Sequence, residues 1–207
     1  MSKGRFESFS DGVIAVAITL LVLNIDVPAP NAKHTLLHEL LALWPAYAAY
    51  ATSFVTIGII WINHHVMIGR LRRPDHAIMM LNLLLLMTIG ILPFATHVMA
   101  EYLRQRHGQK LAAGVYAGSY LAMGIAFGLL NRHILFSKAH LLIVELPLEE
   151  RRRIFARTVS GLAPYALATV LAAVSPYVTL AICAALAAFY ATPLASSPES
   201  EQSSAAA

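Results

Sequence analysis

The sequence predicts an all-α integral membrane protein with six transmembrane helices per chain, and two observations carry this prediction. Hydrophobic residues make up 58% of the 207, charged residues make up only 13%, and the mean hydropathy is +0.64. A soluble domain has about 25% charged residues, so this chain has too little charge to cover a soluble surface. The apolar residues also gather into segments near the ~20 residues that a membrane-spanning helix needs.

Six such segments follow one another along the chain. They cover residues 9–27, 40–67, 78–99, 111–130, 158–174 and 177–194. As a helix the first would be about 28 Å long, close to the ~30 Å of a hydrocarbon core. Only Ser175 and Pro176 separate the last two segments, which predicts a tight helical hairpin.

The remaining segments predict the domain organisation. Residues 136–157 combine apolar residues with a basic run, Arg151, Arg152 and Arg153, and predict an interfacial helix that meets anionic lipid headgroups. Residues 195–207 are rich in Ser and Ala and predict a disordered tail after one six-helix transmembrane domain at residues 1–194.

The basic residues predict the orientation of the chain in a cell membrane. With six spans and a cytoplasmic N-terminus, eleven of the 15 Lys and Arg residues fall on the cytoplasmic side. These are Lys3, Arg5, Arg70, Arg72, Arg73, Arg132, Lys138, Arg151, Arg152, Arg153 and Arg157. Basic loops favour the cytoplasm, so we expect a multi-pass protein of the plasma membrane with both termini inside. The net charge of +4 is explained by these loops, and no nucleic-acid partner is expected.

Four side chains of the first segment, Val16, Thr19, Leu20 and Leu23, form one stripe along the helix, and Thr19 is the mid-span hydroxyl of this segment. On a helical wheel with Val16 at zero, Leu23 falls at about −20°, Leu20 at about +40° and Thr19 at about −60°. Asp11 falls about 140° away and faces other neighbours. The remaining positions of the segment are apolar too, so the wheel alone does not select a functional face.

A charged cluster opens the same segment. Arg5, Phe9, Ser10 and Asp11 are interpreted as residues that position the helix, because an unpaired carboxylate entering hydrocarbon is costly. The second segment offers possible partners at a similar depth, namely Trp61, Asn63 and His64. Two simpler interpretations stay open: Ser10 and Asp11 as an ordinary helix N-cap, and Arg5 as a cytoplasmic charge anchor.

Arg5-x-x-x-Phe9-Ser10-Asp11 followed by GVIAVAITLLVLNI resembles the signature that opens the transmembrane protein 175 family of cation channels. Trp61-x-x-His64, Leu81-Asn82 and Pro93-Phe94 agree with the same resemblance. It implies a homotetramer in which the four first helices line one pore that conducts potassium in preference to sodium without a TVGYG filter.

The resemblance also implies roles for the stripe. Val16, Leu20 and Leu23 would form the apolar pore constriction, and Thr19 would supply a pore-lining hydroxyl. No cofactor is implied beyond the permeant potassium ion, and no acidic ring lies on the stripe; Asp26, near the outer end, could concentrate cations there.

Other functions are less favoured by the sequence. A proton-permeable leak channel of the same family is the nearest alternative. A secondary transporter would show repeat symmetry and broken helices with midplane polar groups, and only Asn82, Thr88 and the Pro164 region hint at these. An enzyme would need a convergent set of polar groups. His64 and His65 invite a metal site, but adjacent residues point about 100° apart on a helix, so no metal is expected.

Overall fold

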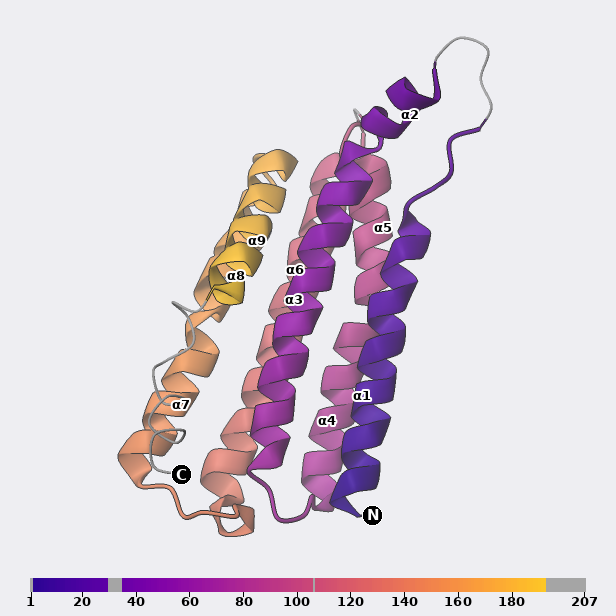
Figure 1. Ribbon diagram of the computed structural model, residues 1–207. Helices are drawn as coiled ribbons and strands as arrows, with labels where there is room; N and C mark the ends of the chain where they lie inside the picture. The colour runs from indigo at the N-terminus through magenta and orange to yellow at the C-terminus, as the bar shows by residue number, and fades with distance from the viewer. Residues whose placement is uncertain (1, 30–34, 106, 193–207) are drawn as a thin grey trace.

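The computed structural model describes residues 2–29, 35–105 and 107–192, and these ranges are helical apart from short connections. They contain no β-strand, only an isolated bridge between Leu71 and Leu142. The predicted all-α class is confirmed. Figure 1 shows the long helices standing side by side in one bundle, with α1 at one edge and α7, α8 and α9 at the opposite edge.

The helices follow the apolar segments of the sequence. They are α1 (Lys3–Leu20), α2 (Leu36–Ala42), α3 (Trp44–Gly69), α4 (His76–Gly90), α5 (Leu92–Tyr102), α6 (Gln109–Arg132), α7 (Leu148–Ser160), α8 (Leu162–Leu171) and α9 (Pro176–Ala191). A 3₁₀ turn, Leu21–Asn24, extends α1, and a π turn, His133–Ser137, extends α6. Side-chain oxygens of Thr35, Asp75 and Ser175 accept backbone N–H groups at the starts of α2, α4 and α9, as N-cap residues do.

Five helical segments in the described ranges are long and apolar enough to cross a membrane. They are Lys3–Asn24, Trp44–Gly69, His76–Tyr102, Gln109–Ser137 and Leu148–Leu171. The sixth predicted segment forms α9, which has 16 residues and is therefore about 24 Å long. The predicted hairpin is present, since α8 and α9 pack against each other across a short turn.

The third predicted span is two helices in line. A boundary between α4 and α5 falls at Ile91, two residues before Pro93. Proline has no N–H to donate to the carbonyl of the preceding turn, so the helix is interrupted there. The Asn24 side chain at the end of the 3₁₀ turn donates to the Pro93 carbonyl at 2.9 Å. This hydrogen bond joins the C-terminal end of the α1 segment to the point where α4 meets α5.

Two expectations from the sequence are corrected. First, α1 begins at Lys3 with Ser2 as its N-cap residue, so Ser10 and Asp11 lie inside the helix and their interpretation as an N-cap is wrong. Second, residues 136–157 do not form one interfacial helix: turns and extended chain occupy 136–147, and α7 begins only at Leu148. It continues through Gly161, which has helical angles, into α8. The predicted tail, residues 195–207, lies outside the described residues.

Candidate functional site

The first helix has one face locked into the bundle. Phe6, Ser10, Ile14, Ala17 and Leu21 are all buried and recur every three or four residues, which is the spacing of one helix face. This face packs against α3, α4 and α5. The contacts fix the rotation of α1 about its own axis, and that rotation decides what the other face presents.

The opposite face carries the stripe singled out in the sequence. Val16 is 56% exposed, Leu20 43% and Leu23 69%, and Thr19 is exposed as well. On the wheel this stripe centres roughly 130° from the buried face. Figure 1 shows α1 at the edge of the bundle, and none of the helices in the described residues covers the stripe. An apolar face of this kind needs lipid, another chain or a narrow pore beside it.

The 3₁₀ turn alters the geometry of the stripe. Leu20 ends α1 and Leu23 lies within the 3₁₀ turn, where residues three apart are eclipsed. The larger rotation per residue of a 3₁₀ turn therefore brings Leu23 nearer to the line above Leu20 than the 60° separation of the α-helical wheel. The rise is about 6 Å from Val16 to Leu20 and again about 6 Å from Leu20 to Leu23, so the three side chains form evenly spaced levels.

Thr19 lies between two of these levels. Its hydroxyl donates to the Val16 carbonyl of the same helix at 2.9 Å. This bond uses the hydroxyl proton and leaves the oxygen lone pairs free. The exposed oxygen can therefore act as a ligand for a cation or as an acceptor for water.

A buried polar chain holds the locked face in place. The Asn82 amide of α4 donates to Ser10 Oγ at 2.9 Å, and Ser10 Oγ donates to the Phe6 carbonyl at 3.0 Å. His64 Nε2 of α3 lies 2.8 Å from Asn82 Oδ1 and donates to it, because an amide oxygen can only accept. Ser10, His64 and Asn82 are each at most 1% exposed. This series of hydrogen bonds joins α1, α3 and α4 inside the bundle.

Asp11 has a partner on the second predicted span. Trp61 donates from Nε1 to Asp11 Oδ1 at 2.9 Å, so these two residues come together at the side of the bundle. Asn63 does not join them, since its amide donates to the Ile59 carbonyl of its own helix at 2.9 Å. His64 reaches α1 through Asn82 and not through Asp11.

The other two residues of the opening cluster lie elsewhere. Arg5 is exposed and makes no hydrogen bond or ion pair with any residue in the described ranges. Phe9 is about half exposed on the same side as Val16, whereas Phe6 is the phenylalanine that enters the core. Among the residues that the structure describes, therefore, Ser10 and Asp11 are the two of the four whose side chains join α1 to its neighbours by hydrogen bonds.

Two polar groupings were not anticipated from the sequence. At the far end of α1, a pocket of about 80 Å³ is lined by residues that include Asn24, Asp26 and Glu101. In the core, Ser53 Oγ lies 2.8 Å from Thr96 Oγ1 and 2.7 Å from the Tyr120 hydroxyl. The second grouping links α3, α5 and α6. Its signal in the sequence is a set of isolated hydroxyl residues within apolar spans, each of which requires a partner.

Comparison with known proteins finds related ion channels. The family described as "Endosomal/lysosomal potassium channel TMEM175" matches residues 5–93. The chain is 44% identical to a potassium channel of Streptomyces collinus over 91% of both chains. It is 40% identical to a potassium channel of Chamaesiphon minutus, over 91% of this chain and 93% of that one.

A solved structure and more distant relatives extend the comparison. The crystal structure of a lysosomal potassium-selective channel TMEM175 homolog from Chamaesiphon minutus superposes with a TM-score of 0.81 at 39% identity, covering 91% of this chain and 96% of that one. An endosomal/lysosomal proton channel TMEM175 of Gallus gallus is 38% identical over 53% of this chain, and the match spans 23% of that longer protein.

Proposed function

Since this chain belongs to the TMEM175 family of ion channels, we propose that it is a potassium-selective cation channel whose pore is lined by the first helices of identical chains. The family consists of channels, so the chain is not an enzyme. One observation carries the proposal: α1 is locked on one face by a buried polar chain and leaves the apolar stripe of Val16, Leu20 and Leu23 uncovered at the edge of the bundle.

The stripe acts as a constriction in this proposal. When four copies of α1 surround an axis, each level becomes a ring of apolar side chains. A narrow apolar ring excludes water, and a potassium ion cannot shed its own water there without replacement ligands. Thr19 supplies such ligands, because its back-bonded hydroxyl presents oxygen lone pairs beside the rings. The ion needs no cofactor for this passage.

The assembly is a homotetramer with α1 innermost. One chain of this size cannot enclose an aqueous path alone, and the edge position of α1 in Figure 1 lets it meet a symmetry axis without rearrangement. The chain crosses the plasma membrane six times, with α9 as a short sixth span and both termini in the cytoplasm. Arg151, Arg152 and Arg153 at the start of α7 then lie where anionic headgroups are found.

The test is a planar-bilayer recording of the purified full-length protein, with potassium on one side and sodium on the other. We expect the current to reverse at a potential displaced toward the potassium equilibrium potential. A reversal at zero, or one displaced toward sodium, would refute potassium selectivity. A structure of the assembly with α1 on the lipid-facing periphery would refute the proposed pore.

A second candidate function is a proton-permeable leak, and the observation that favours it is that the animal relatives are named proton channels. Proton flux into liposomes that hold the protein and a pH-sensitive dye, without permeant metal cations, tests it directly. Acidification at the rate of protein-free liposomes would exclude this function.

A further inference from the structure

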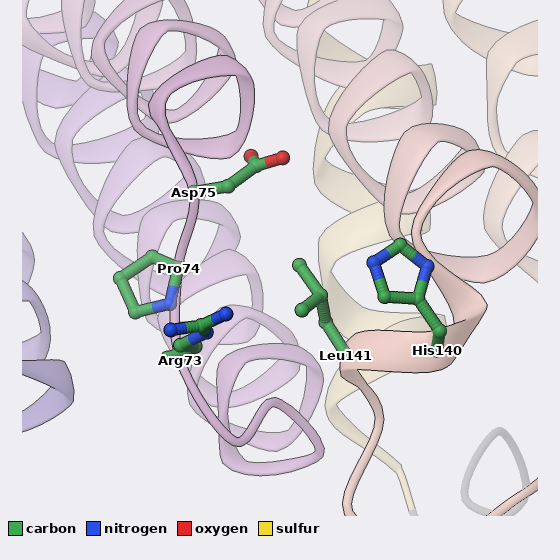
Figure 2. Close-up of a pocket in the computed structure, with 5 residues that line it drawn as sticks. All are labelled: Arg73, Pro74, Asp75, His140 and Leu141. Atoms are coloured by element: carbon green, nitrogen blue, oxygen red, sulfur yellow. The ribbon is translucent and has the colours of Figure 1, made fainter.

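A pocket of about 430 Å³ opens at the end of the bundle where Lys3 and the α3–α4 turn lie, far along the chain from the stripe. Figure 2 shows its two walls: Arg73, Pro74 and Asp75 from the α3–α4 turn, and His140 and Leu141 from the turn that follows α6. The volume falls in the range of small-molecule sites, about 300–1,000 Å³, and exceeds what a bare ion fills.

The two walls are fixed to each other by backbone hydrogen bonds. The Arg72 N–H donates to the Leu141 carbonyl at 2.9 Å, and the Ile143 N–H donates to the Arg70 carbonyl at 2.8 Å. These bonds form the isolated bridge between Leu71 and Leu142. The two turns that form the walls are thus preorganised, and a ligand that binds between them does not need to order them.

The charges of the pocket are unbalanced in favour of an anion. Its only acid, Asp75, is already engaged, since it accepts from the Ile78 N–H at 2.8 Å and pairs with Lys138 at 2.9 Å. Partial burial pushes the pKa of Asp75 upward, but these two partners outweigh it and hold the pKa below its usual value, so Asp75 stays ionised and paired. Arg73 and His140 are exposed and have no hydrogen-bond or ion-pair partner among the described residues.

We propose that this pocket binds the phosphate group of an anionic ligand, with Arg73 on one side and His140 on the other. A guanidinium offers two parallel N–H donors that match a phosphate, and the imidazole adds a donor from the opposite wall. The phosphate can belong to the headgroup of an anionic lipid or to a free phosphate. The pocket lies next to the first turn of the apolar span His76–Tyr102, a position that a headgroup can reach from the membrane.

The pocket is connected through α4 to α1, the helix that lines the pore in the proposed function. The wall that carries Arg73 and Asp75 leads into α4, and α4 carries Asn82, which donates to Ser10 of α1. An occupied pocket therefore anchors the start of the helix that supports α1. Binding itself does not depend on conduction, so the test below stands apart from the test of the proposed function.

The experiment uses the full-length protein in neutral detergent and follows its thermal unfolding midpoint. The probes are short-chain phosphatidylglycerol, phosphatidylcholine of the same chain length, and inorganic phosphate. We expect phosphatidylglycerol or inorganic phosphate, but not phosphatidylcholine, to raise the midpoint in a saturable way. A rise with phosphatidylglycerol alone identifies a lipid headgroup, and a rise with both probes identifies a site for free phosphate.

Two variants and a control variant test whether a rise of the unfolding midpoint is caused by binding in this pocket. Arg73→Gln should weaken the apparent affinity about ten-fold or more, as expected for the loss of a charge-assisted contact, and His140→Gln should weaken it by a smaller factor. Arg132→Gln removes an exposed arginine at the same end of the bundle but outside the pocket, and should leave the affinity within about two-fold. Equal losses in Arg73→Gln and Arg132→Gln, or no loss in Arg73→Gln, would overturn the proposal.

Discussion

Asn82 should be the residue on which the position of α1 depends most. Replacing it with leucine, which is similar in size, removes the acceptor of His64 Nε2 and the donor to Ser10 Oγ, while Ser10 keeps its bond to the Phe6 carbonyl. Leaving one buried donor unpaired costs about 1–3 kcal/mol. The lost hydrogen bond between Asn82 and Ser10 adds to this, and interhelical hydrogen bonds in membranes average about 0.6 kcal/mol. We therefore expect Asn82→Leu to lower the free energy of unfolding by about 2 kcal/mol in total.

The assay is thermal unfolding of the purified protein in one detergent. A loss near 2 kcal/mol should lower the midpoint by about 4–8 °C for a chain of this size. Asn63→Leu is the matched control, because it removes the same amide from an exposed position where the side chain bonds only its own helix. It should change stability by no more than about 0.5 kcal/mol.

A double-mutant cycle tests the coupling between the helices. Ser10→Ala alone should cost about 1 kcal/mol, and the Ser10→Ala, Asn82→Leu double variant should lose about 0.5–1 kcal/mol less than the sum of the two single losses. Strict additivity would show that the two side chains do not support each other. An Asn82→Leu protein as stable as Asn63→Leu would refute the reasoning altogether.

Three further changes test other parts of the account. Asp11→Ala, which removes the acceptor of the Trp61 N–H, should lower the yield of assembled protein by more than it shifts the potassium–sodium reversal potential; well-assembled channels with altered selectivity would reverse this assignment. Thr19→Val should lower single-channel potassium conductance about five-fold, the equivalent of about 1 kcal/mol of lost hydroxyl ligation, and unchanged conductance would remove the hydroxyl from the pore. The pKa of Asp75 is lower in the folded chain than the ~3.9 of an unfolded one, so its stabilising effect is complete above about pH 4 and disappears as the pH falls through the folded value. Asp75→Asn, which loses the ion pair with Lys138, should cost a few tenths of a kcal/mol at neutral pH and reduce the acid dependence of the unfolding midpoint, and an unaltered acid dependence would argue against the pair.

Much of the fold could be predicted because lipid imposes simple rules on sequence. Apolar length identifies the spans, whereas the interruption of the third one before Pro93 came from the structure. The ends of the helices were not predicted correctly. The helix start at Lys3 and the run of α7 into α8 lie in charged stretches of the sequence, where apolar length gives no signal for a helix.

The candidate site could be predicted only in part for a different reason. The helix is apolar on all sides, so the sequence contains no contrast between a face that meets protein and one that does not. The 3₁₀ turn that carries Leu23 has no marker residue, so its effect on the stripe had to come from the structure. Likewise, Asn82 could be recognised as a polar residue in need of a partner, but its choice of Ser10 and His64 depends on how three helices pack.

The central claim is that the exposed stripe of α1 forms the barrier to conduction, and Leu20→Asn tests it most directly. Asparagine is similar in size but polar, so the ring at this level should stay hydrated. The control is Leu129→Asn on α6, where the leucine is 44% exposed, against 43% for Leu20, but lies outside the stripe. The measurement is single-channel conductance and reversal potential under potassium–sodium bi-ionic conditions, beside the wild-type protein.

We predict that Leu20→Asn raises the resting potassium current about ten-fold, the equivalent of about 1.4 kcal/mol off the barrier, and weakens discrimination against sodium because ions pass with more of their own water. Leu129→Asn should leave both quantities near their wild-type values. If Leu129→Asn changes conductance and reversal potential as much as Leu20→Asn does, or if Leu20→Asn changes neither, then α1 does not present this stripe to the pore.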